Sequence, residues 1–247
     1  MSDDAQSQTL RAILGLRGMI IDGKLPPGSR VSETVVVEAL DVSRTPARMA
    51  LVRMKDEGLL EQLPSGGFVV SGFTEAEFLD AIEVRGTLEG MAARFAAERG
   101  AAPSVLTELE RCVSDLDKVI ADLGDPLDLD DYMALNDRFH ELLVEASGST
   151  MVARSLDRVK SLPFAAPNAF VNSSGSGRPE VRLILTVAQD QHRSILEAIR
   201  NRQGTRAQAL TFEHSFQATK YLRLALETEK SIENVPILRL IRRRSRV

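Results

Sequence analysis

The chain has 247 residues, enough for two small domains or one large one. Hydrophobic residues make up 43% of it and charged residues 27%, with a net charge of -4, so neither a disordered chain nor a strongly basic nucleic-acid-coating protein fits. Aromatic residues contribute 4% and Trp is absent, which disfavours a site built on stacked aromatic rings.

Three features bear on the compartment. Cys112 is the one cysteine and therefore has no intrachain partner for a disulfide. The N-terminal MSDDAQSQ is acidic and polar, unlike a secretory signal. Apolar runs fall far short of the roughly 18 residues that cross a bilayer. We therefore expect a cytoplasmic protein that does not enter a membrane.

The N-terminal part carries signals for three short helices. Apolar residues recur at helical spacing over 8–22, and the helix is expected to end in DGKLPPG, which is rich in Pro and Gly. Ser32 provides the N-cap for a second helix, SETVVVEAL, although the valine run 35–37 would suit a strand better. Ser43 begins a third helix, which Gly58 is placed to end.

A small hairpin follows these helices. The segments LLEQLP and FVVSGF flank Ser65-Gly66-Gly67, a turn sequence between two strand-like runs. Three short helices followed by a hairpin, with a tight turn between the second and third helices, is the layout of a winged helix-turn-helix. The sequence therefore predicts a DNA-binding domain over residues 1–72.

The third helix begins with groups suited to DNA. Arg44 and Arg48 stand four apart and share one helix face, and Arg can bond both acceptors on a guanine edge. Ser43 and Thr45 lie in the first turn, where hydroxyl and backbone N–H groups suit phosphate oxygens, and the glycine turn could approach the minor groove. The alternative is that both arginines are merely solvated helix charges.

The stretch LPPGSRVSETVVVEALDVSRTPARMALVRMKDEGLLEQLPSGGFVV resembles the DNA-binding domain of GntR-family bacterial transcription regulators. The resemblance covers Leu25 to about Val70 and implies DNA contacts from Arg44, Thr45 and Arg48, support from Glu33, and a wing carrying Gly66 and Gly67. Met49 departs from the family, which usually has Glu there.

The charge of this domain is nearly balanced. Residues 1–72 hold eight Lys or Arg and nine Asp or Glu, so non-specific attraction to phosphates is weak unless basic residues cluster on one face. A homodimer presenting two recognition helices would compensate by doubling the contacts, and we expect one.

The rest of the chain has helical signals almost throughout. Thr74 and Glu77 form a capping box before a helix that ends near Gly100. Further helices are expected over 103–124, 128–146, 154–162, 180–202 and 205–228, with a kink and loop between Pro163 and Pro179. The predicted fold is mainly α, with an all-helical bundle over 73–229 and an Arg-rich tail over 230–247.

The three histidines, His140, His192 and His214, lie on different predicted helices, and Asn136 precedes the first by one helical turn. Three imidazoles and one oxygen ligand from neighbouring helices would hold a divalent metal with open positions. The alternative is that the histidines are separate surface or core residues.

The stretches LNDRFHELLVEASGS, QDQHRSILEAI and TFEHSFQATKYL resemble the helical effector-binding domain, called FCD, of the fatty-acid-regulator-like branch of the GntR family, over about Thr74 to Leu226. The resemblance implies a divalent metal, such as zinc, nickel or manganese, held by Asn136, His140, His192 and His214. Many relatives have Asp at the first of these positions, so the neutral Asn removes a charge.

IEVRGTLEGMAARFAAE is similar to the first helix of that domain and implies that Arg85 points into the cavity. An arginine beside a metal favours a carboxylate effector, because both complement its charge. A helix salt bridge from Arg85 to Glu89 is the alternative. The position of the proline-rich loop in the sequence is the one reason to expect that its residues Phe164, Asn168 and Phe170 line one side of the pocket.

These features together predict a ligand-responsive transcriptional repressor, a homodimer that binds operator DNA and responds to a small carboxylate metabolite. The alternatives are a metal-dependent hydrolase with a three-histidine site, although no H-E-x-x-H motif is present, and a regulator that senses the metal itself. The terminal LRLIRRRSRV is expected to be solvated or to form a second nucleic-acid contact.

Overall fold

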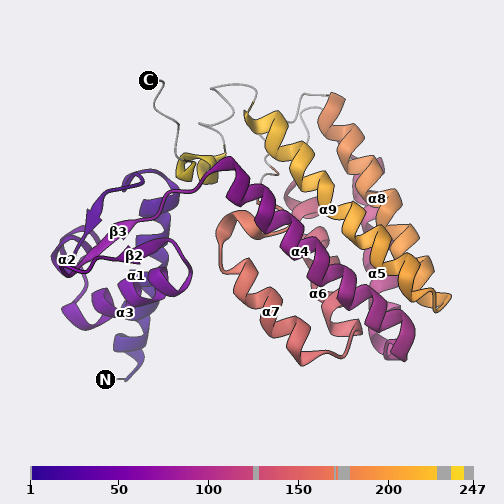
Figure 1. Cartoon of the computed structure of the whole chain (residues 1–247), viewed down its shortest axis with the longest axis horizontal. Helices are drawn as coiled ribbons and strands as arrows, with labels where there is room; N and C mark the ends of the chain where they lie inside the picture. Colours follow the sequence, from indigo (N-terminus) through magenta and orange to yellow (C-terminus); the bar gives the residue numbers. More distant parts are fainter. Residues whose placement is uncertain (1, 125–127, 170, 172–178, 227–234, 242–247) are drawn as a thin grey trace. The chain divides into compact units, whose positions relative to one another are not determined.

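A computed structural model of the chain describes residues 2–124, 128–169, 171, 179–226 and 235–241. The chain folds into two compact units (Figure 1). The N-terminal unit comprises Met1–Glu77 together with Val235–Val247, and the C-terminal unit comprises Phe78–Asn234. Within the described ranges, no helix has the length and apolar character needed to cross a membrane.

The N-terminal unit is a winged helix-turn-helix. Its elements are α1 (Ser2–Ile21), β1 (Arg30–Val31), α2 (Glu33–Leu40), α3 (Arg44–Asp56), β2 (Leu60–Gln62) and β3 (Phe68–Val70). The strands form an antiparallel sheet in the order β1-β3-β2. The predicted helices and hairpin are confirmed, whereas β1 is an additional strand that the sequence analysis did not predict.

Helix packing builds the core of this unit. The α1 helix buries Ala12, Leu16 and Ile20, which lie four residues apart, and packs on α3. The valine run is helical despite its strand propensity, because Ser32 caps α2 and Val36 is buried. The turn after α2 passes through Asp41, whose φ of 49° is left-handed. These contacts fix the orientation of α3 within the unit.

The C-terminal end of the described chain returns to this unit. A short 3₁₀ helix, η4 (Pro236–Leu240), buries Ile237, Leu238 and Leu240 and contacts α1. The Phe73 N–H donates to the Leu240 carbonyl at 2.8 Å, and Phe73 forms a parallel bridge with Ile241. The segment from Leu238 was expected to be solvated, but its apolar residues pack. The arginines after Ile241 lie outside the described residues.

The C-terminal unit is an all-helical bundle, as predicted. Its elements are α4 (Glu75–Phe95), continued by the π-helical η1 (Ala96–Gly100), then α5 (Pro103–Ala121), α6 (Asp130–Ala146), α7 (Thr150–Lys160), the 3₁₀ helix η2 (Pro163–Ala165), α8 (Pro179–Arg200) and α9 (Gly204–Leu226). The predicted capping box opens α4: the Thr74 N–H donates to Glu77 Oε2 at 2.6 Å, and the Glu77 N–H donates to Thr74 Oγ1 at 3.2 Å. The pairs α8/α9 and α5/α6 pack most extensively.

Candidate functional site

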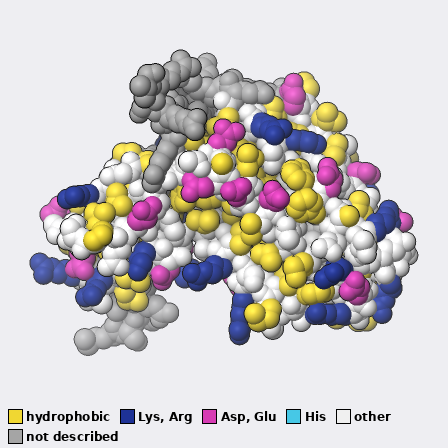
Figure 2. Space-filling view, in the orientation of Figure 1, with side chains coloured by type: hydrophobic (Ala, Val, Ile, Leu, Met, Phe, Trp, Pro, Cys, Tyr) yellow, Lys and Arg dark blue, Asp and Glu magenta, His cyan; other side chains and the backbone are white. Residues whose placement is uncertain are grey.

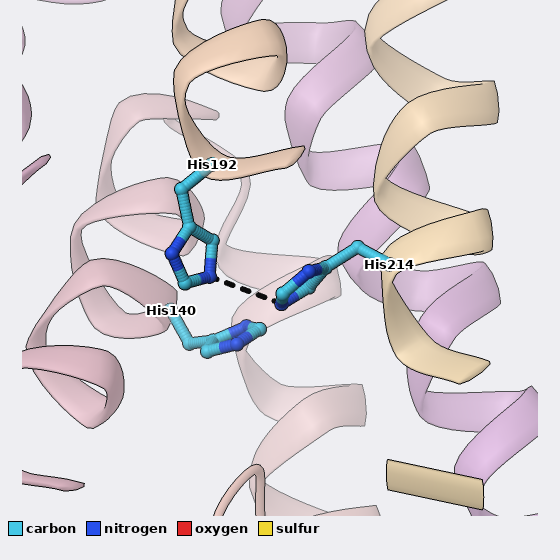
Figure 3. Close-up of side chains that lie close together, drawn as sticks. All are labelled: His140, His192 and His214. Atoms are coloured by element: carbon cyan, nitrogen blue, oxygen red, sulfur yellow. Dashed lines mark hydrogen bonds between the residues drawn. The ribbon is translucent and has the colours of Figure 1, made fainter. Parts of the chain in front are cut away.

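Three helices bring the histidines together in the interior of the C-terminal unit. His140 comes from α6, His192 from α8 and His214 from α9, and their rings face one another (Figure 3). Each offers a ring nitrogen within 4.8 Å of those of the other two. All three are buried, and no histidine is visible on the face drawn in Figure 2. The histidines are therefore neither surface residues nor separate from one another.

The orientation of His192 is fixed by Gln189, one helical turn earlier. His192 Nδ1 lies 3.1 Å from Gln189 Oε1. The Gln189 amide nitrogen donates to the Val113 carbonyl at 2.8 Å and to Asp117 Oδ1 at 2.6 Å, so its oxygen must face the ring. His192 therefore carries its proton on Nδ1, and its Nε2 has a free lone pair.

An equivalent series of hydrogen bonds orients His214. His214 Nδ1 lies 3.2 Å from Gln191 Oε1, which also accepts the Gln217 amide at 3.0 Å. Lys220 donates to Gln217 Oε1 at 3.2 Å, which fixes the direction of the Gln217 amide. His214 therefore also has its proton on Nδ1, and its lone pair is on Nε2.

The two free lone pairs point at each other. His192 Nε2 and His214 Nε2 are 3.1 Å apart, as the dashed line in Figure 3 marks. Two acceptors at this distance repel unless a cation lies between them. Nitrogens that bind one ion at about 2.1 Å each lie about 3.0–3.4 Å apart for bond angles between 90° and 109°. The pair thus has the spacing and chemistry of two ligands of one metal ion.

The protonation states of His192 and His214 are also those of metal ligands. Burial lowers the pKa of His214 to about 3, and His140 adds to the shift. Burial also lowers the pKa of His192 well below its ordinary value, with further contributions from His214 and His140. Both rings are neutral near pH 7, which is the form that binds metals.

A buried carboxylate faces His140. His140 Nδ1 lies 3.2 Å from Glu89 Oε2, and Arg85 Nη1 lies 3.7 Å from the same oxygen. Burial raises the pKa of Glu89, but His140 and Arg85 outweigh that effect and hold the pKa below its ordinary value. The carboxylate is therefore ionised and lies beside the His140 ring, although neither its oxygens nor His140 Nδ1 has a well-oriented hydrogen bond among the described residues.

Asn136 supplies an oxygen at the same place. Its Nδ2 donates to Asn168 Oδ1 at 2.9 Å, and Asn168 Nδ2 in turn donates to the Met133 carbonyl at 2.8 Å. This fixes the amide so that Oδ1 is the remaining group, and Oδ1 is buried without a hydrogen-bond partner among the described residues. An amide oxygen in this position is available to a ligand.

Asn136, His140 and His214, but not His192, line a small cavity of about 20 Å³. Its wall includes Arg85, Asn136, His140, His214 and Tyr221. The Arg85 Nε and the Tyr221 hydroxyl are buried there and lack hydrogen-bond partners within the described part of the chain. Arg85 therefore both approaches Glu89 and faces the cavity, so the two interpretations of this residue are compatible.

The loop after α7 contributes differently from the expectation. Asn168 reaches the cavity wall only through Asn136, whereas Pro167 and Val171 line it directly. Phe164 stacks on Phe78 with ring centroids 4.1 Å apart and belongs to the core. Phe170 lies outside the described residues.

The predicted DNA-contacting residues lie on the surface of the N-terminal unit. Arg44, Thr45 and Arg48 are exposed on α3, and Ser43 is exposed at its N-cap without a side-chain capping bond. Arg48 Nε lies 3.9 Å from Glu33 Oε1 at the start of α2.

The predicted wing is a tight turn with two glycines at its tip. Gly66 and Gly67 have φ values of 89° and 79°, which other residues rarely adopt. The Gly66 N–H donates to the Leu63 carbonyl at 2.9 Å, which closes the turn. Both glycines are exposed, so backbone groups are accessible at the tip.

The sequence analysis did not identify the polar residues around the histidine rings. These are Glu89, whose carboxylate lies beside His140, and the hydrogen-bonding glutamines Gln189, Gln191 and Gln217. One signal was available. Gln189 precedes His192 by three residues on the otherwise apolar buried face of α8, and a buried polar residue there needs a partner.

Two family models match the chain. Residues 8–70 match bacterial regulatory proteins of the gntR family, and residues 80–217 match the FCD domain. The uncharacterized HTH-type transcriptional regulator YdhC of Bacillus subtilis (strain 168) is 27% identical over 215 residues, covering 87% of this chain and 91% of the relative. The HTH-type transcriptional repressor RspR of Escherichia coli (strain K12) is 25% identical over 211 residues, covering 84% and 86%.

A solved structure shares the fold. E. coli McbR/YncC superposes with a TM-score of 0.61 at 20% identity, covering 89% of this chain and 99% of that protein. The family models account for both units, and regulators of transcription, not hydrolases, are the relatives found. The chain therefore belongs to the GntR family of bacterial regulatory proteins, carries an FCD domain, and is a transcriptional regulator rather than an enzyme.

Proposed function

We propose that this regulator is a homodimeric repressor whose affinity for operator DNA is controlled by a small carboxylate metabolite bound beside a divalent metal. The observation that carries the metal site is the pair of imidazole lone pairs that face each other at 3.1 Å. The hydrogen bonds to Gln189 and Gln191 hold both rings in the metal-binding tautomer.

The ligands would be His140, His192, His214 and Asn136. Three imidazoles and an amide oxygen suit borderline ions such as zinc or nickel, and manganese to a lesser extent. The neutral Asn136 leaves a higher positive charge at the site than an Asp would. When bound, the ion would attract an anion to its open positions.

A carboxylate is the effector that the cavity favours. Arg85, His140 and His214 all line the cavity, so the arginine and a metal ion held by the histidines could both meet one anionic ligand. The cavity of about 20 Å³ has room for about one water molecule. An organic carboxylate therefore requires a wider cavity, and a ligand that binds only the wider state shifts the population towards it. The effector would therefore have different affinities for the narrow and the wide state, and such a difference is required if it is to control DNA binding.

The N-terminal unit would contact the operator through α3 and the wing. Arg44 and Arg48 are exposed and would pair with guanine edges. Glu33 would orient Arg48, and Ser43 and Thr45 would contact phosphates. Gly66 and Gly67 would bring backbone N–H groups close to the minor groove.

Dimerisation and repression are proposed for reasons that do not involve the histidine site. Two recognition helices are needed to read a two-fold symmetric operator, since one domain offers few base contacts. The similarity to RspR, named as a repressor, supports repression. Such a regulator would act in the cytoplasm, with the bacterial chromosome.

The test measures operator binding by fluorescence anisotropy, using a duplex selected from random DNA by the full-length protein. Metal-loaded protein is titrated with a panel of two- to six-carbon carboxylates. We expect at least one to change the Kd for DNA more than tenfold, and both His192→Ala and Arg85→Ala to abolish that change. The exposed Arg111→Ala is the matched control and should retain it.

Two outcomes would contradict the proposal. If Arg85→Ala responds to the carboxylate as the wild type does, Arg85 is not an effector-binding residue. If metal alone changes DNA binding and no carboxylate adds to it, the protein is a metal sensor.

A further inference from the structure

The exposed face of α3 carries apolar side chains among its DNA-facing residues. Met49 and Val52 are 51% and 44% exposed, and both belong to the few large hydrophobic side chains that the structure leaves on the surface. The opposite face is fully used by the core: it buries Pro46, Ala47, Ala50, Leu51 and Met54. The exposure of Met49 and Val52 is therefore a property of the outward face and not of incomplete packing.

Met49 and Val52 share this face with the predicted base readers. At about 100° per residue, Arg44, Arg48, Val52, Thr45 and Met49 fall in that order within an arc of about 140°. Apolar and basic side chains accordingly lie next to one another on this face of α3. A partner that approaches the arginines must also approach the apolar pair.

Met49 lies close to α1. Thr9 on α1 donates its hydroxyl to Met49 Sδ at 3.9 Å, which is a weak contact. Met49 lies five residues after Arg44, which corresponds to about 7.5 Å along the helix axis. Met49 is therefore too far along the helix to meet the base that Arg44 reads, and it would meet another base pair of the same half-site.

The major groove offers one apolar group, the 5-methyl group of thymine, and apolar side chains recognise it. We propose that Met49, extended by Val52, forms an apolar patch that reads a thymine methyl in each operator half-site. The inference rests on the proposed operator binding through α3. It assigns sequence selectivity to a side chain that neither donates nor accepts a strong hydrogen bond.

Replacing thymine by uracil removes only this methyl group and leaves base pairing intact. Full-length protein first selects an operator from random duplex DNA, and each thymine is then replaced singly by 2′-deoxyuridine. We expect one position per half-site at which the Kd rises about fourfold, the effect of burying one methyl-sized group. Replacement in both half-sites should raise the Kd about sixteenfold.

The variant Met49→Ala should bind the thymine and uracil operators equally, while Met49→Leu should retain the preference. Comparing the variants on the same two duplexes removes any effect of uracil on the DNA itself. Met151→Ala is the matched control, because Met151 is 67% exposed on α7 in the other unit. It should discriminate as the wild type does.

The inference is overturned if the wild type binds all uracil operators as tightly as the parent duplex. It is also overturned if Met49→Ala keeps the full thymine preference, since another group would then read the methyl. Failure of the selection to enrich any DNA is a different result. It would refute the proposed operator binding, and the inference with it.

Discussion

Gln189 offers a direct test of how the histidine site is held. Replacing Gln189 by Met keeps a side chain of similar size but removes the oxygen that accepts the His192 Nδ1 proton at 3.1 Å. The imidazole can then carry its proton on Nε2, the nitrogen that faces His214. None of the four proposed ligands is changed by this substitution.

The magnitude follows from the contacts that are lost. Removal of a group that orients a metal-binding histidine weakens metal affinity about 10–100-fold. The amide also donates to the Val113 carbonyl and to Asp117, so these two hydrogen bonds are lost as well. We expect this to cost about 1–3 kcal/mol of folding stability. The variant should therefore still fold if the parent stability is typical.

The assay is a competition titration of zinc against a chromophoric chelator, at pH 7.5, with denaturant melts of the metal-free proteins in parallel. Gln203→Met is the matched control, since Gln203 is exposed and its side chain accepts a hydrogen bond only from Arg206 among the described residues. An unchanged zinc Kd in folded Gln189→Met would refute the claim that Gln189 sets the tautomer of His192.

Three further predictions concern stability. In the metal-free protein, His192 and His214 have lowered pKa values, so below pH 6.5 the unfolded chain binds more protons than the folded chain. The free energy of unfolding from urea titrations should therefore fall as the pH is lowered from 6.5 to 5, by up to about 1.4 kcal/mol per pH unit for each histidine, and a flat profile would contradict this. Gly86→Ala should destabilise the C-terminal unit by about 1–3 kcal/mol, because the new Cβ would lie 2.6 Å from Ser215 Cβ. Gly18→Ala in α1 should instead stabilise the protein by about 0.5–1 kcal/mol, because no atom lies within 4 Å of the new Cβ. Thermal melts in which both substitutions change stability in the same direction would refute the packing argument. Leu240→Ala should cost about 2–5 kcal/mol because Leu240 is fully buried, and Leu14→Ala, at a 54% exposed position, should cost little in the same urea titration; equal effects would mean that η4 does not stabilise its unit.

Local sequence signals predicted most of the helices. The capping box at Thr74 was read correctly because both of its hydrogen bonds involve residues three apart. The α7 helix was expected from Arg154 but begins at Thr150, where the Ser149 side chain accepts the Val152 N–H at 3.3 Å. Ser149 is a typical N-cap residue in the sequence, so the predicted start of this helix was wrong by about one turn.

Elements that depend on distant partners were not predictable in this way. The strand β1 has only two residues and exists through its pairing with β3. The segment Pro236–Leu240 was expected to belong to a tail, yet it contacts Phe73 and α1, which lie more than 160 residues earlier in the chain. In both cases tertiary contacts, and not local propensity, decide the structure.

The candidate site was likewise predictable only where its residues lie close together in the sequence. Spacing placed Asn136 and His140 on one helix face, but no spacing relates His140 to His192 and His214 on other helices. Their approach depends on how α6, α8 and α9 pack. The glutamines that orient the rings became evident only when their hydrogen bonds could be traced from atom to atom.

Metal stoichiometry tests the central claim most directly. Full-length protein, exposed to zinc and then dialysed, is examined by native mass spectrometry with elemental analysis, beside His140→Ala handled in the same way. The facing imidazoles and the free Asn136 oxygen predict about one divalent ion per chain in the wild type and its loss in the variant. A wild-type protein that retains no more metal than His140→Ala would contradict the account.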